Sequence, residues 1–181
     1  MSINEPTTVY FQTIPLLGRN FMLLESINGT VLATGWDTTA LDLVQRAKLQ
    51  PQVKVQTVHE STKATQAVTQ FGANDYTALD DVVVDQPGTE LQRAVWQHLR
   101  TIPAGTTQTY TEVAKAVGSP AAIRAVASAC GKNANALFVP CHRVVAQSGA
   151  LAGFAWGLDV KEELLRHEGA LESRAGHTVC V

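Results

Sequence analysis

A chain of 181 residues can fold as one domain or two small ones around a substantial hydrophobic core. Hydrophobic residues make up 45% of it and charged residues 17%, which are ordinary values for a globular protein. No apolar run approaches the roughly 18 residues that a membrane span needs. The N-terminus lacks a basic region followed by an apolar core, so we expect no signal peptide and a cytoplasmic protein. Three cysteines without a Cys-x-x-Cys pair, and five scattered histidines, predict neither disulfides nor a structural metal.

The net charge of −2 does not by itself indicate a nucleic-acid-binding protein. Residues 1–86 carry five Lys/Arg and nine Asp/Glu, a net charge of −4, whereas residues 87–171 carry eight and six, a net charge of +2. This asymmetry is mild and equally typical of two solvated surfaces. Binding to an anionic polymer must therefore depend on local geometry.

The first half of the chain has the residue pattern of a small α+β unit. Asn28-Gly29 stands between two apolar runs, and this dipeptide favours a type I′ hairpin turn because both residues accept positive φ. No pattern in this half indicates a chemistry, so we interpret it as a scaffold. The elements expected here are a strand over 9–14, hairpin strands over 21–24 and 31–33, a helix capped by Thr38 or Thr39, a strand over 53–57 and a helix that begins near Ser61.

A turn at Asp85-Gln86-Pro87-Gly88 places a domain boundary near residue 86, and helix signals follow it. Ser119-Pro120 is expected to begin a helix that runs through Arg124 to Gly131. Together with the helix before Gly118 it has the proportions of a helix-turn-helix. Residues 172–181 are interpreted as a tail. Three capping boxes predict the other helix starts: Thr89 with Gln92, Thr109 with Glu112, and Asp159 with Glu162.

The helix after Ser119-Pro120 is rich in small residues from Ala121 to Ala129. Such a composition is typical of a tightly packed core helix. It also permits a close approach to a nucleic-acid backbone, and Arg124 is a single large cation among the alanines. A helix with few groups that read bases favours contacts to backbone and shape over sequence-specific readout. The pattern alone leaves both interpretations open.

A cysteine–histidine pair follows the apolar run 136–139, which predicts a short buried strand. Pro140 lacks an N–H and should end that strand, so Cys141 would lie at its end beside His142. Thiolate chemistry requires a small nucleophile on a rigid mount next to a base or a cation. Taken alone, however, such a pair is more often a packed thiol beside an unrelated imidazole.

Two later features are candidates to complete a site. The stretch 153–157 places two aromatic residues between glycines, as a pocket wall or a plain surface loop would. Glu168 is expected in the last turn of a helix before Gly169, where the helix dipole disfavours a carboxylate. A histidine is a natural partner for it, although an exposed glutamate without a role fits as well.

Together these segments resemble one known family. The run Val139-Pro140-Cys141-His142-Arg143-Val144 is similar to the Pro-Cys-His-Arg-Val signature of the O6-alkylguanine-DNA alkyltransferases. The resemblance extends from about Gly88 to Gly169 and is strongest to the C-terminal domain of the bacterial adaptive-response protein. It is also carried by Val95-Trp96, Ile102-Pro103, Gly105, Thr109-Tyr110, Arg124-Ala125-Val126, Asn133, Gly153, Trp156-Gly157 and Leu164-Leu165.

The resemblance implies an α/β (α+β) fold with two domains. Residues 1–86 would form a ribonuclease-H-like sheet domain, and residues 87–171 a mainly helical, winged-helix-like domain with a helix-turn-helix. It further implies a monomer that binds double-stranded DNA containing O6-alkylguanine through the minor groove and flips the damaged base out. The alkyl group would pass irreversibly to Cys141, with O4-alkylthymine as a second candidate lesion. No cofactor, metal or membrane is implied.

The family's roles carry over to matching positions of this sequence. Cys141 would be the acceptor, His142 a base acting through a bridging water, and Glu168 the group that orients the imidazole. Asn133 would brace the turn, and Tyr110 would hydrogen-bond the guanine and crowd the 3′ phosphate. The expected DNA-binding residues are Tyr110, Ala121, Arg124 (which would replace the flipped base in the stack), Ala125 and Ser128. The expected base-pocket residues are Cys130, Val144, Phe154, Ala155 and Trp156, whose indole would narrow the pocket against bulky alkyl groups.

Three other functions are weighed against this one. A non-catalytic alkyltransferase-like protein would bind lesions without repairing them, but such proteins lack the cysteine that Cys141 supplies. A cysteine hydrolase would turn over a small ester or amide. A helix-turn-helix regulator would bind one DNA sequence tightly and ignore lesions.

Overall fold

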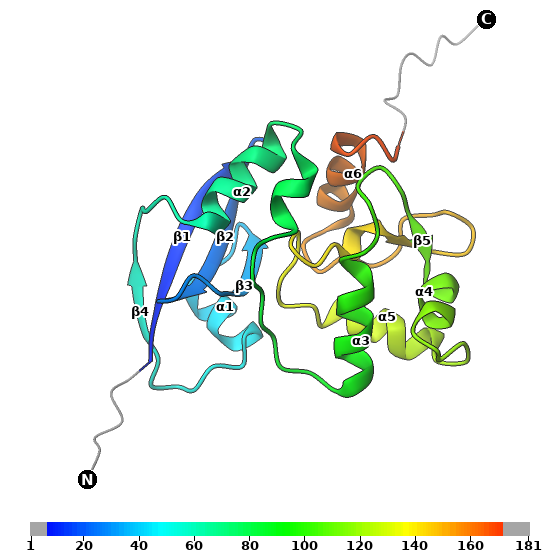
Figure 1. The fold of residues 1–181 in the computed structure, drawn as a ribbon, viewed down its shortest axis with the longest axis horizontal. Helices are drawn as coiled ribbons and strands as arrows, with labels where there is room; N and C mark the ends of the chain where they lie inside the picture. Colours follow the sequence, from blue (N-terminus) through cyan, green and yellow to red (C-terminus); the bar gives the residue numbers. More distant parts are fainter. Residues whose placement is uncertain (1–6, 172–181) are drawn as a thin grey trace, which may run out of the picture.

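The computed structural model describes residues 7–171, and its N-terminal half is built on a four-stranded sheet (Figure 1). The strand order is β3-β2-β1-β4, with β4 parallel to β1 and the other pairs antiparallel. The strands predicted over this half and their hairpin are confirmed. Their bounds are β1 Thr8–Leu16, β2 Arg19–Ser26, β3 Val31–Trp36 and β4 Lys54–Thr57.

The hairpin turn between β2 and β3 differs from the prediction. Gly29 has a φ of 80°, but Asn28 does not have a positive φ, so the predicted type I′ turn is wrong. The chain instead closes a longer turn, in which the N–H groups of Gly29 and Ser26 donate to the carbonyls of Ser26 and Thr30, each at 2.9 Å. One left-handed residue is then sufficient to join the strands.

Two helices cover opposite faces of this sheet. In β2, Leu23 packs in a cluster with side chains of α2 (Lys63–Gly72), and the next residue, Leu24, packs with side chains of α1 (Ala40–Arg46). Successive strand side chains point to opposite faces, so α1 and α2 lie on opposite sides. Thr39 caps α1 as predicted, and α2 begins close to the predicted start.

The C-terminal half is mainly helical, so the predicted fold class is confirmed: an N-terminal sheet followed by a helical part (Figure 1). Its two short strands pair in parallel. Within residues 7–171 no helix has both the length and the apolar composition needed to cross a membrane. The 3-10 turn η1, Tyr76–Leu79, still belongs to the N-terminal half. The elements of the C-terminal half are α3 Glu90–Leu99, β5 Gln108–Thr109, α4 Tyr110–Ala116, α5 Ile123–Gly131, the 3-10 turn η2 Cys141–Arg143, β6 Val144–Val145 and α6 Leu158–His167.

Two of the predicted helix starts are wrong. The capping boxes at Thr89 and Thr109 are present as predicted. However, α6 begins at Leu158, and the side chain of Asp159 pairs with Arg19 at 2.8 Å instead of capping the helix. Helix α5 begins at Ile123, three residues after the predicted start at Pro120. The residues before it form a separate turn, in which the N–H of Ala122 donates to the carbonyl of Ser119 at 2.9 Å.

The segment 136–139 is buried as predicted, but it is not a strand. Leu137 has a φ of 77°, in the left-handed region, which interrupts an extended run. The N–H of Val139 donates to the carbonyl of Asn135 at 2.8 Å and closes a helical type of turn. Cys141 therefore follows a turn and begins η2, rather than lying at the end of a strand.

The two halves share an apolar core. Residues 136–138 belong to the same cluster as β1, β2 and α2, together with Val160 and Leu164 of α6. The rings of Phe21 in β2 and Phe138 have centroids 6.5 Å apart. A second cluster, between α3, α4 and α5, contains Cys141. The division of the chain at residue 86 into two domains stays a prediction.

Candidate active site

Cys141 faces a cavity of about 490 Å³ from the first position of η2. Only 7% of the residue is exposed. Segments far apart in the sequence meet around the thiol: α4, α5 and the loop before α6. The lining residues are Tyr110, Ala127, Cys130, Gly131, Cys141, Ala152, Gly153, Phe154 and Ala155. The structure thus brings together four of the predicted site residues beside Cys141: Tyr110, Cys130, Phe154 and Ala155.

His142, Arg143 and Glu168 form a buried charge cluster directly after the thiol. Nε2 of His142 lies 2.8 Å from Oε1 of Glu168, and the Arg143 guanidinium donates to both oxygens of the same carboxylate at 2.7 to 3.2 Å. These partners explain a carboxylate at the C-terminal end of α6, where the dipole disfavours it. The predicted pairing of His142 with Glu168 is present. The ion pair between Arg143 and Glu168 was not predicted, although the position of Arg143 next to His142 in the sequence could have indicated it.

The electrostatics of the cluster favour an ionised Glu168 and a neutral His142. Burial lowers the pKa of His142 in spite of the adjacent carboxylate. Burial alone would raise the pKa of Glu168, but its interactions with His142 and Arg143 lower it to about 2. Because Nε2 must donate to the carboxylate, Nδ1 of a neutral His142 carries the lone pair. Nδ1 is buried and has no hydrogen-bond partner among the described residues, so it is the atom that can accept a proton.

Asn133 donates a hydrogen bond to the acceptor sulfur. Its Nδ2 lies 3.3 Å from Sγ of Cys141 and 2.8 Å from the carbonyl oxygen of Val139. Burial raises the pKa of the Cys141 thiol, and the bond from Asn133 and the charge of Lys161 counteract that rise. The predicted bracing of the turn by Asn133 matches this geometry.

Gln86 is a neighbour of Asn133 that the sequence did not indicate as part of a site. Its Nε2 donates to Oδ1 of Asn133 at 3.1 Å, and its Oε1 accepts from the N–H of Ala134 at 2.7 Å. In the sequence it stands between turn residues, which indicated a domain boundary only. No local signal reveals its role, because its partners are 47 and 48 residues away.

Tyr110 and Cys130 face the same cavity as Cys141 from α4 and α5. The hydroxyl of Tyr110 donates to the carbonyl of Ala152 at 2.8 Å, and burial raises its pKa to about 12. Burial likewise raises the pKa of Cys130 to about 12. Both groups are therefore protonated at neutral pH, so Tyr110 is a hydrogen-bond donor and Cys130 a weak nucleophile.

Lys161 is fully buried and forms hydrogen bonds with backbone carbonyls of two segments near the cavity. Its Nζ donates to the carbonyls of Val144 at 2.6 Å, Ala152 at 3.0 Å and Gly153 at 3.3 Å. Burial lowers its pKa. Lys161 was not predicted as a site residue. Its position beside Val160, on the buried face of a predicted helix, could have indicated a buried lysine. Lys161 connects β6 to the loop that lines the cavity.

Two of the predicted pocket residues do not line the cavity. Val144 is fully buried in the core, and its carbonyl accepts from Lys161. The indole of Trp156 lies against β3 and α1, where the guanidinium carbon of Arg46 is 4.3 Å from its ring centroid. A Cβ at Gly35 would overlap this indole. Trp156 therefore does not narrow the space beside Cys141. Its indole packs instead against Gly35 and Arg46 of the N-terminal half.

Of the predicted DNA-binding residues, Tyr110 lies on α4 at the cavity, and the other four lie on the outer face of α5 and the turn before it. Ala121, Arg124, Ala125 and Ser128 are all exposed. Val126 and Ala129, on the other face, are buried against α3 and α4. Among residues 7–171 no group of three or more Cys, His, Asp or Glu is arranged to hold a metal ion.

Comparisons with known proteins relate this fold and site to one family. Residues 90–170 match the family described as 6-O-methylguanine DNA methyltransferase, DNA binding domain. Over 94% of its length the chain superposes on a variant of the Mycobacterium tuberculosis protein OGT, covering 97% of that chain with a TM-score of 0.68 and 30% identity. The chain belongs to the O6-methylguanine methyltransferase family. OGT has also been solved in complex with DNA, and that structure matches with a TM-score of 0.68 and 29% identity, over 90% of this chain and 94% of that one.

Two curated relatives of this methyltransferase family member match its C-terminal half. The Escherichia coli protein named bifunctional transcriptional activator/DNA repair enzyme Ada is 52% identical over 91 residues, 50% of this chain and 26% of Ada. A methylated-DNA--protein-cysteine methyltransferase of Methanosarcina acetivorans is 51% identical over 90 residues, 50% of this chain and 58% of that protein. The chain thus spans between a quarter and three fifths of the length of these relatives.

Proposed function

We propose that this protein repairs DNA by a single transfer of an alkyl group from O6 of guanine to Cys141. The observation that carries the proposal is a thiol at a cavity, followed in the chain by a buried, neutral imidazole that Glu168 holds together with Arg143. The names of the relatives support the same reaction. The thiol is useful as an acceptor only while it is reduced, which is consistent with the cytoplasm.

The chemistry follows from the groups around the sulfur. Nδ1 of His142 takes the thiol proton through one water, while Glu168 stabilises the imidazolium that forms. The thiolate then attacks the alkyl carbon in line, so that the S–C bond forms as the C–O6 bond breaks. The electron pair leaves on the guanine. The Tyr110 hydroxyl, which burial keeps protonated, exchanges its bond to the carbonyl of Ala152 for one that it donates to the leaving base.

Access to the lesion requires base flipping, because O6 of guanine lies inside the duplex. We assign DNA binding to the exposed face of α5, whose small residues Ala121, Ala125 and Ser128 allow a close approach in the minor groove. Arg124 is the exposed cation positioned to fill the gap left by the base. The DNA complex of the Mycobacterium tuberculosis relative supports DNA as the partner. Every group named for the transfer comes from one chain, so a monomer suffices.

Among the described residues that line the cavity, none would displace the alkyl chain from the thioether product, so one molecule acts once. Cys130, the other thiol at the cavity, is protonated at neutral pH and does not serve as a second acceptor. Non-catalytic lesion binding, ester hydrolysis and sequence-specific regulation are the alternatives. None of these three leaves an alkyl group on the protein in one equivalent.

Intact-mass and peptide mass spectrometry after incubation with O6-methylguanine DNA test the proposal. We expect an increase of about 14 Da, one equivalent at most, on the peptide that contains Cys141. Cys141→Ala should abolish the increase, and the matched variant Cys130→Ala should keep it. An unmodified protein that retains tight binding to the lesion would overturn repair in favour of lesion binding.

A further inference from the structure

The hydrogen bond from Asn133 to the acceptor sulfur is the last of three consecutive hydrogen bonds. The N–H of Ala134 donates to Oε1 of Gln86, Nε2 of Gln86 donates to Oδ1 of Asn133, and Nδ2 of Asn133 donates to Sγ of Cys141. The side chains of Gln86 and Asn133 are both buried. The two amides therefore form a continuous path from a backbone group to the sulfur.

Backbone groups fix the direction of every bond in this path. A peptide N–H can only donate, so Ala134 requires that the oxygen of Gln86 face it and that the Gln86 nitrogen face Asn133. The N–H of Asn135 also donates to Oδ1 of Asn133, at 3.0 Å, and the carbonyl of Val139 accepts from Nδ2. Asn133 must accordingly present a donor, and not its carbonyl oxygen, to the sulfur.

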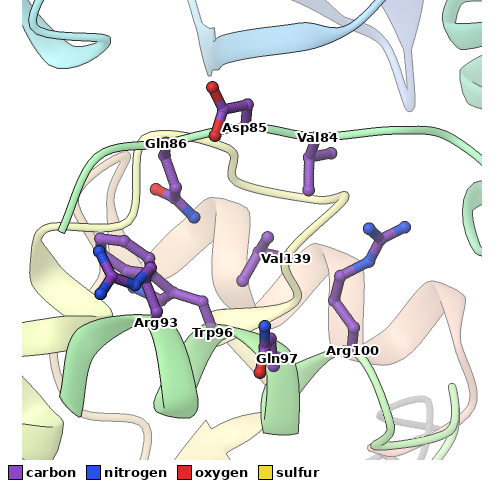
Figure 2. Close-up of a pocket in the computed structure, with 8 residues that line it drawn as sticks. All are labelled: Val84, Asp85, Gln86, Arg93, Trp96, Gln97, Arg100 and Val139. Carbon is purple, nitrogen blue, oxygen red and sulfur yellow. The ribbon is translucent and has the colours of Figure 1, made fainter. Parts of the chain in front are cut away.

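Gln86 reaches this position from a different cavity than the one that Cys141 lines. It points from the segment that joins the two halves into a second cavity, of about 280 Å³, which it shares with Trp96, Gln97 and Val139 (Figure 2). Cys141 does not line that cavity, and Gln86 does not line the cavity of Cys141. Gln86 therefore touches neither the sulfur nor any base bound next to it.

We propose that Gln86 is a positioning residue for the alkyl acceptor: it holds the Asn133 amide in the orientation that donates to Sγ of Cys141. The proposal rests on Cys141 being the acceptor. As a consequence, Gln86, a residue of the segment that links the sheet to the helical half, stabilises the thiolate indirectly through Asn133. No residue of the Pro-Cys-His-Arg motif supplies this function.

The discriminating substitution is Gln86→Glu. It keeps the shape of the side chain and the bond from the N–H of Ala134, but it replaces the Nε2 donor by a second acceptor oxygen. A carboxylate facing Oδ1 of Asn133 repels it and weakens the donation to sulfur. The titratable groups that face the thiol, Tyr110 of α4, Cys130 of α5 and Lys161 of α6, are unchanged, as is the His142 cluster. Loss of a hydrogen bond to a charged group is expected to slow thiolate reactions at neutral pH roughly tenfold or more.

The measurement is the rate of Cys141 alkylation by iodoacetamide as a function of pH, read on the Cys141 peptide by mass spectrometry. We expect Gln86→Glu to move the midpoint of this profile upward by about one pH unit. Gln97→Glu is the matched control, because it adds the same charge to the same outer cavity without a bond to Asn133. Its profile should equal that of the unsubstituted protein.

A second variant covers the case in which Gln86→Glu does not fold. Gln86→Ala opens the amide position to the outer cavity, so added acetamide is expected to restore the alkylation rate that this variant loses. A role limited to folding predicts no such rescue. Equal pH profiles for Gln86→Glu and Gln97→Glu, or a Gln86→Ala rate that acetamide leaves unchanged, would overturn the proposal.

The same variants separate this inference from the proposed function. If the unsubstituted protein takes no methyl group from O6-methylguanine DNA, the repair function fails, and the iodoacetamide profiles still report on Gln86. If methyl transfer proceeds but Gln86→Glu transfers as fast as Gln97→Glu, only the role of Gln86 fails.

Discussion

Glu168 is the residue on which the buried charges converge, because it is the only carboxylate that contacts Arg143 and His142 in the described part of the chain. Glu168→Gln would leave the buried Arg143 guanidinium without its counter-charge. We expect a loss of about 3–5 kcal/mol in the free energy of unfolding by urea, together with slower methyl transfer. The control Glu163→Gln breaks a partly exposed pair with Arg19 and should cost at most about 1 kcal/mol. Equal losses for both variants would contradict this account.

The pH dependence of stability follows from the same cluster. The folded pKa of Glu168 is about 2, below the ordinary value of 4.5, so its contribution is complete above pH 4.5 and is lost as the pH falls toward 2. That contribution is on the order of 3 kcal/mol. The pKa of His142 is also lowered, so the unfolded chain binds that proton first and stability starts to fall below its ordinary value of 6.5. Urea unfolding between pH 7 and pH 3 should show this decline, and Glu168→Gln should flatten its lower part.

At the scale of single residues, the sequence was sufficient to predict a His142–Glu168 pair next to Cys141, but not the residues that support this group. Cys141 and His142 belong to one short motif, and Glu168 stands at a predicted helix end. Gln86 and Lys161 act on backbone and amide groups that only the folded chain brings near them. Their side chains give no local sign of those partners.

Among the elements, the loop before α6 depends on a contact with the other half of the chain. Trp156 follows the cavity-lining residues Phe154 and Ala155, and its ring occupies the space that a side chain at Gly35 would need. We expect Gly35→Ala to lower stability by about 1–3 kcal/mol and to slow methyl transfer, because it displaces the loop. Gly72→Ala is the control: its Cβ would meet only Leu16 at 3.5 Å, so stability should stay equal or rise by up to about 1 kcal/mol. Unchanged transfer by a destabilised Gly35→Ala protein would show that the anchor is only structural.

Prediction of the elements succeeded where the signal was local. The capping boxes at Thr89 and Thr109 close hydrogen bonds within three residues, so the sequence suffices to place those helix starts. The segment 136–139 is apolar because it is buried between the halves, and the left-handed Leu137 that prevents a strand there has no signature in the residue pattern. The orientation of Trp156 depended on Gly35, more than a hundred residues earlier in the chain.

At the scale of the whole molecule, the shared core predicts one cooperative unfolding transition. Phe21→Ala in β2 should lower stability by about 3–5 kcal/mol, although Phe21 is remote from the thiol in sequence. Circular dichroism and tryptophan fluorescence, to which Trp96 of α3 contributes, should change at the same urea concentration, in this variant and in the unsubstituted protein. Leu41→Ala, at a position that is 65% exposed, should change stability by less than about 0.5 kcal/mol. Two transitions at different urea concentrations would show that the halves unfold separately.

Helix α6 supplies both Lys161 and, at its end, Glu168, and it follows Cys141 in the chain. During synthesis on a ribosome the thiol therefore emerges before the carboxylate that poises its base and before the lysine that shapes its cavity. A nascent or prematurely terminated chain carries the nucleophile with the reactivity of an unassisted cysteine. In the proposed single transfer the acceptor site is therefore complete only once α6 docks, which protects the thiol from being consumed before the fold around it has formed.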